Sequence, residues 1–401
     1  MKKIFAFALI LAGLGSLSAQ SFVKHFPENK QLVKNFNEND SLKILAVMVE
    51  FQEDRYDATV GNGKFGSVYT QDYGDIIIDP LPHNAQYFED HLLFAKNYFR
   101  KVSNGKVNIS YKVLPEVLTV SKYMRDYTPV YNSNDYTPMG NFTKEVWELA
   151  DKKFTGVQFK DYDLFIIFHA GVSAGIDLGT FTIDRNMPSL YLSGDALTKI
   201  FGNQFKGIPV NNGSAFINNS IIMSETESRE STDITGKVYI DQFSINGFLV
   251  SNIGSYLGIP DLQNTITGRS AIGRFGLMDS QGLNANFGMF PPEPSPWEKI
   301  YMGWETPVTI SNQDQRVNIT TKMTSTPGDT TLLKIPINSS EYYLVENRAQ
   351  DALKNNAIIT YKRSGNIYTK VVHPDTSGYY YIMPDSIPGG VVIDEIGRAH
   401  V

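Results

Sequence analysis

Hydrophobic residues in the first three quarters of the chain alternate between two spacings, one typical of buried strands and one typical of amphipathic helices. Short apolar runs predict buried strands at 44–49 and 164–168, and an alternating run predicts a half-exposed strand at 107–113. Apolar residues at helical spacing predict helices at 85–102 and at about 143–153. Strands that alternate with helices indicate a mixed class, α/β or α+β.

From about residue 308 onward the pattern changes to short apolar runs separated by turn residues. These runs predict strands at 332–335, 342–345 and 379–382. We therefore expect an all-β domain over 308–395, cut short at its C-terminal end, after a first domain over 20–307.

Both ends of the chain are interpreted as segments outside the fold. Lys2 and Lys3 precede an apolar run at 4–14, which predicts a signal peptide over 1–19 that is too short for a membrane anchor. No later stretch predicts a transmembrane segment. The protein is therefore expected to be secreted, periplasmic or on the cell surface. Residues 396–401 are interpreted as a sequencing artefact rather than as protein.

Composition narrows the class of protein. The chain has 401 residues, a formal net charge of −6 and no cysteine. The mild acidity argues against nucleic-acid binding, which needs a basic face. Without cysteine the protein has no disulfides and no thiolate metal ligands. With 42% hydrophobic residues it has ample material for a core that stands without such crosslinks.

Residues 244–258 are predicted to form the helix that carries the candidate site. Gly258 supplies a C-terminal cap, and Pro260 prevents the helix from continuing. One face of this helix is apolar and is lined by residues four apart, namely Leu249, Ile253 and Leu257.

Polar residues on another face of this helix have the spacing of the metzincin zinc site. In that site, two His four apart bind zinc, a Glu beside the first acts as general base, and a glycine turn brings in a third ligand. In this chain Ser251 and Ser255 occupy the two histidine positions. Asn252 occupies the glutamate position, and Asp261 follows the glycine turn at a third-ligand position. We call these four positions the metzincin frame.

Beyond the frame, the chain resembles the immune-inhibitor-A type of secreted bacterial metallopeptidase. The segments that carry the resemblance are 257–262, 273–279, 296–299 with 303–304, and 342–348. The resemblance covers roughly 44–395. It implies an α+β fold with a zincin or metzincin-like domain followed by a truncated all-β domain, and it places Met278 in the Met-turn beneath the site.

The substitutions in the frame remove the chemistry of zinc hydrolysis. Serine hydroxyls are poor zinc ligands compared with imidazole, and the amide of Asn252 cannot accept a proton as a general base. Asp261 alone does not build a tight site. We therefore expect a pseudo-peptidase without a cofactor, whose vestigial cleft binds extended polypeptide or serves a structural role. The sequence predicts no oligomeric state.

Three alternatives to the pseudo-peptidase remain open. An active metallopeptidase would need atypical zinc ligands, for which Asp261 and the strand-end residue His169, a candidate cleft residue, are the first choices. The other usable histidines show no paired ligand spacing and are His25, His83, His91 and His373. A serine nucleophile at Ser251 or Ser255 lacks a Gly-x-Ser-x-Gly elbow. A surface adhesion protein would depend on the β domain.

An acidic stretch at 224–233 raises the further alternative of structural calcium, because carboxylate oxygens are the ligands that calcium prefers. Its carboxylates are Glu225, Glu227, Glu230 and Asp233. No EF-hand spacing is present, so the default expectation for this stretch is a solvated loop.

Overall fold

The computed structural model describes residues 41–71, 73, 79, 81–130, 135–174, 185–264, 269–279, 283, 288–289, 291–310, 314–322, 324–348, 357–363 and 366–372. The expected signal peptide, the expected strand at 379–382 and residues 396–401 lie outside these ranges, as do His25 and His373.

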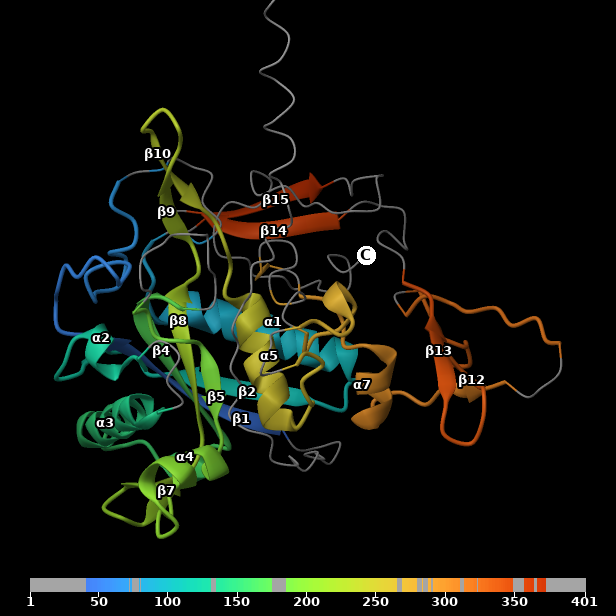
Figure 1. The fold of residues 1–401 in the computed structure, drawn as a ribbon, viewed down its shortest axis with the longest axis horizontal. Coiled ribbons are helices and arrows are strands. Elements are labelled where there is room, and N and C mark those ends of the chain that lie inside the picture. The colour runs from blue at the N-terminus through green and yellow to red at the C-terminus, as the bar shows by residue number, and fades with distance from the viewer. Residues whose placement is uncertain are drawn as a thin grey trace, which may run out of the picture.

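A six-stranded sheet forms the centre of the fold (Figure 1). Its strands are β1 (Ser41–Glu50), β2 (Asn108–Val113), β3 (Leu118–Thr119), β4 (Leu164–Val172), β5 (Leu190–Leu192) and β8 (Ser220–Thr226). The order is β2-β1-β4-β8-β5, and β3 also pairs with β1. Neighbours are parallel except β5, which runs antiparallel to β8 at one edge. The three strands predicted in this region are confirmed.

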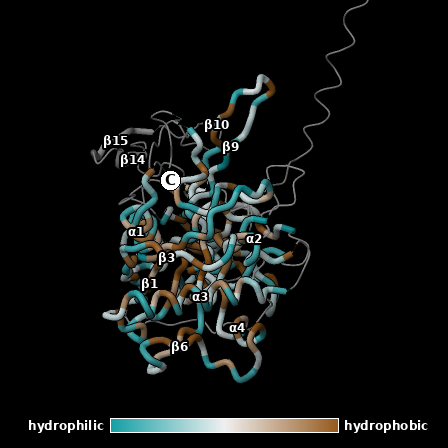
Figure 2. Tube along the Cα trace, turned by 90° about the vertical axis from the view of Figure 1, so that its left-hand side faces the viewer, coloured by the Kyte–Doolittle hydropathy of each residue, from teal (hydrophilic) through white to brown (hydrophobic). Residues whose placement is uncertain are grey.

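Helices cover both faces of this sheet. One face packs against α1 (Ala85–Val102) and α5 (Asn246–Leu257), and the other against α3 (Thr137–Lys153). Two shorter helices, α2 (Met124–Tyr127) and α4 (Gly194–Phe201), lie on the α3 side. A sheet buried on both faces explains why β1 and β4 are almost continuously apolar in sequence. Figure 2 shows hydrophobic stretches running through the interior.

The helix ends follow from local capping chemistry. The Asn84 side chain accepts the backbone N–H groups of Gln86 and Tyr87, at 3.1 and 3.3 Å, so α1 begins where the sequence predicts. Helix α3 begins at Thr137, six residues before the predicted start, with Pro138 in its first turn. Proline fits that position because its missing N–H would have no helical partner there.

The remaining elements are small sheets and short helices. Strands β6 (Ile208–Val210) and β7 (Ala215–Ile217) form one hairpin, and β9 (Arg229–Thr232) and β10 (Val238–Asp241) form another, which projects from the body in Figures 1 and 2. Two 3₁₀ turns, η1 (Phe159–Asp161) and η2 (Gly273–Phe275), and helix α7 (Pro296–Tyr301) complete this part.

Every described element beyond residue 308 is a strand. Strands β11 (Val308–Thr309), β12 (Leu332–Pro336) and β13 (Tyr342–Glu346) form a three-stranded sheet, and β14 (Ala357–Arg363) pairs with β15 (Asn366–Val372). The strands predicted at 332–335 and 342–345 are thereby confirmed. The chain as a whole is a mixed α and β protein. No helix in its described part is long and apolar enough to cross a membrane.

Candidate functional site

Helix α5 carries the central positions of the metzincin frame and ends at a left-handed glycine. Gly258 has φ 96° and ψ 18°, and its N–H donates to the carbonyl groups of Gly254 and Ser255. The N–H of Ile259 donates to the Gly254 carbonyl at 3.0 Å. Such a cap favours glycine because a side chain is strained at positive φ. The cap predicted from the sequence is present, and it turns the chain towards Asp261.

The three frame residues on α5 are buried. Each donates a hydrogen bond to a backbone carbonyl of the same helix or to a methionine sulfur. The Ser255 hydroxyl donates to the Ser251 carbonyl at 3.3 Å, and the Asn252 amide donates to the Phe248 carbonyl at 2.9 Å. Ser251 Oγ lies 3.9 Å from the sulfur of Met278. Although the sequence places these residues on a polar face, the structure buries all sides of α5.

The turn that carries Met278 packs closely against α5. Two carboxylates, of Glu298 and Asp279, hold the backbone of this turn and of the preceding residues in place. A Cβ added to Gly254 would lie 3.1 Å from Met278 Sδ, so the absent side chain allows the close approach. The Met278 N–H donates to Glu298 Oε1 at 3.1 Å. Asp279 Oδ2 accepts three consecutive backbone N–H groups at 2.8, 3.0 and 3.2 Å, from Ala271, Ile272 and Gly273.

The donor atoms at the frame do not fit a zinc ion. Two neutral hydroxyls and one amide stand where imidazole nitrogens and a carboxylate would be needed. Asp261 adds a single carboxylate beyond the glycine turn. Within the ranges described above, no group of three or more acidic or histidine side chains is placed to hold a metal ion.

The structure buries His169, which the sequence offered as a candidate cleft residue. It is fully buried in β4, where its ring lies 5.7 Å from that of Phe51 and its Nδ1 lies 2.9 Å from the Ala170 carbonyl oxygen. Burial lowers the pKa of His169 to about 4. Phe51 belongs to the α3 side of the sheet, whereas Ser251 lies on the α5 side. The sheet therefore separates His169 from the frame, and the two cannot form one metal site.

His91 has the structural role that its position in an amphipathic helix predicts. Its Nδ1 lies 2.7 Å from Oδ1 of Asn246, the first residue of α5, so the imidazole joins α1 to α5. Burial lowers the pKa of His91 to about 4, which keeps the ring neutral at physiological pH.

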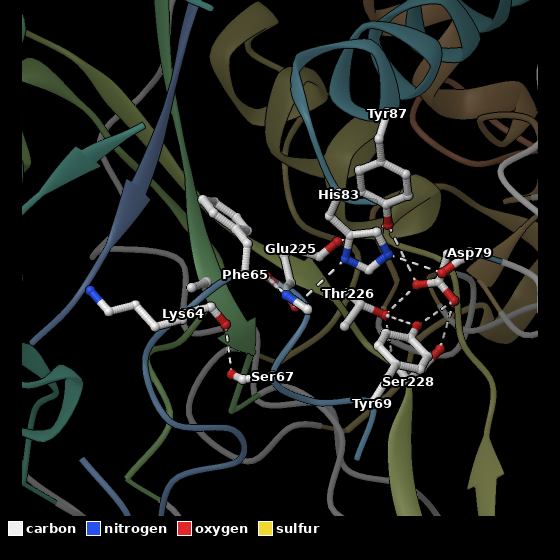
Figure 3. Close-up of polar contacts among 12 residues, drawn as sticks. Lys64, Phe65, Ser67, Tyr69, Asp79, His83, Tyr87, Glu225, Thr226 and Ser228 are labelled. Atoms are coloured by element: carbon white, nitrogen blue, oxygen red, sulfur yellow. Dashed lines mark hydrogen bonds and ion pairs between the residues drawn. The ribbon is translucent and has the colours of Figure 1, made fainter. Parts of the chain in front are cut away.

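A buried polar cluster beyond the frame brings together Asp79, His83 and Glu225 at the carboxyl end of β8 (Figure 3). His83 lies between the two acids, with Nε2 2.9 Å from the Asp79 carbonyl oxygen and Nδ1 3.6 Å from Glu225 Oε1. Its ring stacks on Tyr87 with centroids 4.1 Å apart. We call this cluster the hub, and we include the hydroxyl donors around it, namely Tyr69, Tyr87, Thr226 and Ser228.

The hub has unusual electrostatics because all three ionisable groups are inaccessible to water. Burial raises the pKa of Asp79 and of Glu225. Burial alone would lower the pKa of His83, but Glu225 and Asp79 together outweigh burial and raise that pKa. The Asp79 carboxylate accepts hydroxyl groups from Tyr69 at 2.8 Å and Ser228 at 3.0 Å. Sequence reasoning missed the hub because Glu225 lies more than 100 residues after its partners, although Asp79 and His83 are only four residues apart.

The acidic stretch at 224–233 is not a solvated loop throughout, and its carboxylates do not converge. Glu225 and Glu227 are fully buried, and Glu227 accepts the Ser224 hydroxyl at 2.7 Å while Glu225 faces the hub. Glu230 lies in the projecting hairpin, and Asp233 caps its exposed turn. The four carboxylates have different partners, so the structure does not support the calcium alternative.

No protein-family model matches this chain, and no curated protein matches it. The chain is a mixed α and β protein whose buried helix α5 ends at a left-handed glycine and packs against a methionine-bearing turn.

Proposed function

We propose that this chain is a catalytically inactive relative of the immune-inhibitor-A type metallopeptidases. In this proposal it is a secreted pseudo-peptidase with a zincin-like domain over 20–307 and a β domain over 308–395. The observation that carries the proposal is the juxtaposition of Ser251 and Met278, 3.9 Å apart, next to the left-handed turn at Gly258. The frame and its turn are retained, whereas the residues at its ligand positions are serines.

Inactivity follows from the chemistry of the frame. Hydrolysis by a zinc peptidase needs ligands that hold the ion and a base that takes a proton from bound water. Ser251, Asn252 and Ser255 supply neither, because hydroxyl and amide groups are poor zinc ligands and do not accept a proton from bound water. A domain without these groups can still bind polypeptide or serve a structural role.

Extended polypeptide would bind by adding a strand to an accessible edge of the main sheet. Strand β2 lies at one end of the sheet order, and Ser110 and Lys112 in this strand are exposed. Strand β5 at the other end is buried along its whole length and is not accessible. A peptide that adds a strand beside β2 gains backbone hydrogen bonds without any catalytic group.

The zinc content of the folded protein tests the proposal. We expect almost no zinc and no chelator-sensitive peptide hydrolysis in the wild type. The triple variant Ser251→His, Asn252→Glu and Ser255→His should bind about one zinc per chain if the frame is metzincin-like, with Asp261 as the third ligand. The matched control replaces the two serines with Ala and the asparagine with Gln.

The outcomes separate the two halves of the proposal. About one zinc in the wild type together with chelator-sensitive hydrolysis would refute inactivity and restore the active metallopeptidase with atypical ligands. A triple variant that keeps native circular dichroism but binds no more zinc than its control would refute the metzincin frame, even if the wild type is inactive.

A surface adhesion protein is the second candidate, and exposed apolar residues of the β12–β13 sheet favour it. Tyr343 is 63% exposed and Ile337 is 56% exposed. Clustered apolar exposure of this kind indicates interaction surfaces. A binding screen with the two predicted domains separately would discriminate, because binding confined to the part beyond residue 308 supports adhesion.

A further inference from the structure

The hub joins the end of β8 to two neighbouring segments that come much earlier in the chain. Glu225 stands at the end of β8, and His83 immediately precedes the cap of α1. The third part is a loop at 64–69, whose Gly66 N–H donates to both Glu225 oxygens at 3.1 and 3.3 Å. The Glu225 carboxylate therefore attaches Gly66 to the end of β8, while the neighbouring Phe65 N–H donates to Glu50 at the end of β1, at 3.1 Å.

Hydrogen-bond geometry shows where protons must lie in the hub. The Asp79 carbonyl oxygen can only accept, so Nε2 of His83 carries a hydrogen. Glu225 accepts backbone N–H groups from Gly66 and Gly171, and its Oε1 also faces His83 Nδ1 at 3.6 Å. A bare imidazole nitrogen and a carboxylate oxygen are both acceptors. One proton on either partner makes their contact attractive, and loss of that proton leaves two acceptors facing each other without water.

The groups around His83 keep this proton in place up to a higher pH than an exposed histidine would allow. The Glu225 carboxylate raises the pKa of His83, and burial raises the pKa of Glu225, so both partners favour the protonated pair. Asp79 adds a second negative charge on the other side of the ring. Burial holds the pKa of Tyr69 and of Tyr87 well above the usual value, so both remain hydroxyl donors.

His91 also faces this region from α1, across the Tyr87 ring. Its pKa is lowered to about 4 by burial, so it stays neutral through the neutral and alkaline range. It therefore neither competes for the proton nor adds a charge that changes with pH there.

We propose that the Asp79–His83–Glu225 hub is a proton-dependent clasp, which fastens Gly66 in the 64–69 loop to the end of β8 in acidic and neutral medium and releases this contact in alkaline medium. The sign follows from linkage. The closed state binds one proton more tightly than the open state. Closure is therefore complete below the pKa of histidine in the unfolded chain and is lost as the pH rises through the pKa of the closed pair.

Amide hydrogen exchange read by mass spectrometry tests the clasp. After correction for the intrinsic pH dependence of exchange, the peptide that contains 64–69 should lose about tenfold in protection per pH unit above the pKa of the closed pair. The peptide from β1 at 44–49 is the internal control and should keep its protection. Equal pH profiles for the two peptides between pH 6 and pH 10 would overturn the proposal.

Two variants and a direct titration complete the test. In Glu225→Gln, the amide can donate to a bare Nδ1, so no titrating proton is needed and the pH dependence of the loop should disappear. His83→Gln should also abolish it, whereas the control His91→Gln should keep the wild-type slope. A wild-type slope in His83→Gln would refute the clasp.

The titration needs no variant that could misfold. Spectra of the wild type with ¹⁵N-labelled histidine should show one ring whose nitrogen shifts change with a midpoint well above pH 6.5, because the ring senses loss of the shared proton from either partner. If no ring shows a change with a midpoint above that of an exposed histidine, the clasp is overturned.

Discussion

Lys299 offers the sharpest test of how charge is accommodated inside this protein. It lies in α7 and is buried, with Nζ 2.6 Å from Glu293 Oε2 and 3.1 Å from Glu346 Oε2. Glu346 belongs to β13, so this one ammonium group joins the first part of the chain to the three-stranded sheet. We predict that Lys299→Met, which keeps the apolar stem but removes the charge, lowers the free energy of unfolding by about 3 kcal/mol.

The magnitude follows from what remains after the substitution. Breaking a buried ion pair costs about 3–5 kcal/mol, because the partner charge stays behind without compensation. Here Arg348 still pairs with Glu346, which moderates the loss. Both glutamates also keep some exposure, at 14% and 16% of their side chains, so water screens part of the remaining repulsion. These two effects place the expected loss at the lower end of the range.

Urea unfolding of the wild type and the variant measures this loss. Lys144→Met is the matched control, because Lys144 is 48% exposed and lies 3.9 Å from Glu148 on the surface of α3. That control should change stability by less than about 0.5 kcal/mol. Adding Glu293→Gln to Lys299→Met should recover part of the loss. A loss below about 1 kcal/mol for Lys299→Met would refute the assignment of Lys299 as a charge on which the fold depends.

Three further predictions concern the site and its supports. Gly254→Val should lower the free energy of unfolding by about 2 kcal/mol in urea, because its added atoms meet Met278, and an unchanged value would contradict the close packing of the turn. Asp279→Ala should cost about 3 kcal/mol by thermal unfolding, since three backbone N–H groups lose their acceptor, and a loss under 1 kcal/mol would exclude this role. His169, with a pKa of about 4, should make the protein less stable as the pH falls from 6.5 towards 4, because the unfolded chain binds that proton more tightly. His169→Phe should flatten this part of the pH profile of the unfolding midpoint, and an unaltered profile would show that His169 does not cause it.

The sequence determined the elements whose signals are local. Helix α1 was predicted at its observed bounds because apolar residues at helical spacing and a closing Asn-Gly pair lie within one stretch. Helix α5 was predicted for the same reason, through its apolar spacing and Gly258. The early start of α3 was missed although Met139 and Phe142 continue its helical spacing and Pro138 is typical of a first turn.

Only the tertiary structure decided which side chains meet. Strand β4 is apolar throughout, so its sequence has no alternation from which the side of the sheet facing His169 could be read. Glu225 and Glu227 lie in an acidic stretch whose composition is typical of a solvated loop. The structure buries them, and distant residues such as Gly66 supply hydrogen bonds to Glu225. Capping and periodicity are properties of neighbouring residues and can be read from a sequence. The face of the sheet on which a side chain lies, and the residue that pairs with a buried charge, depend on how distant segments pack. A single sequence does not allow that packing to be predicted.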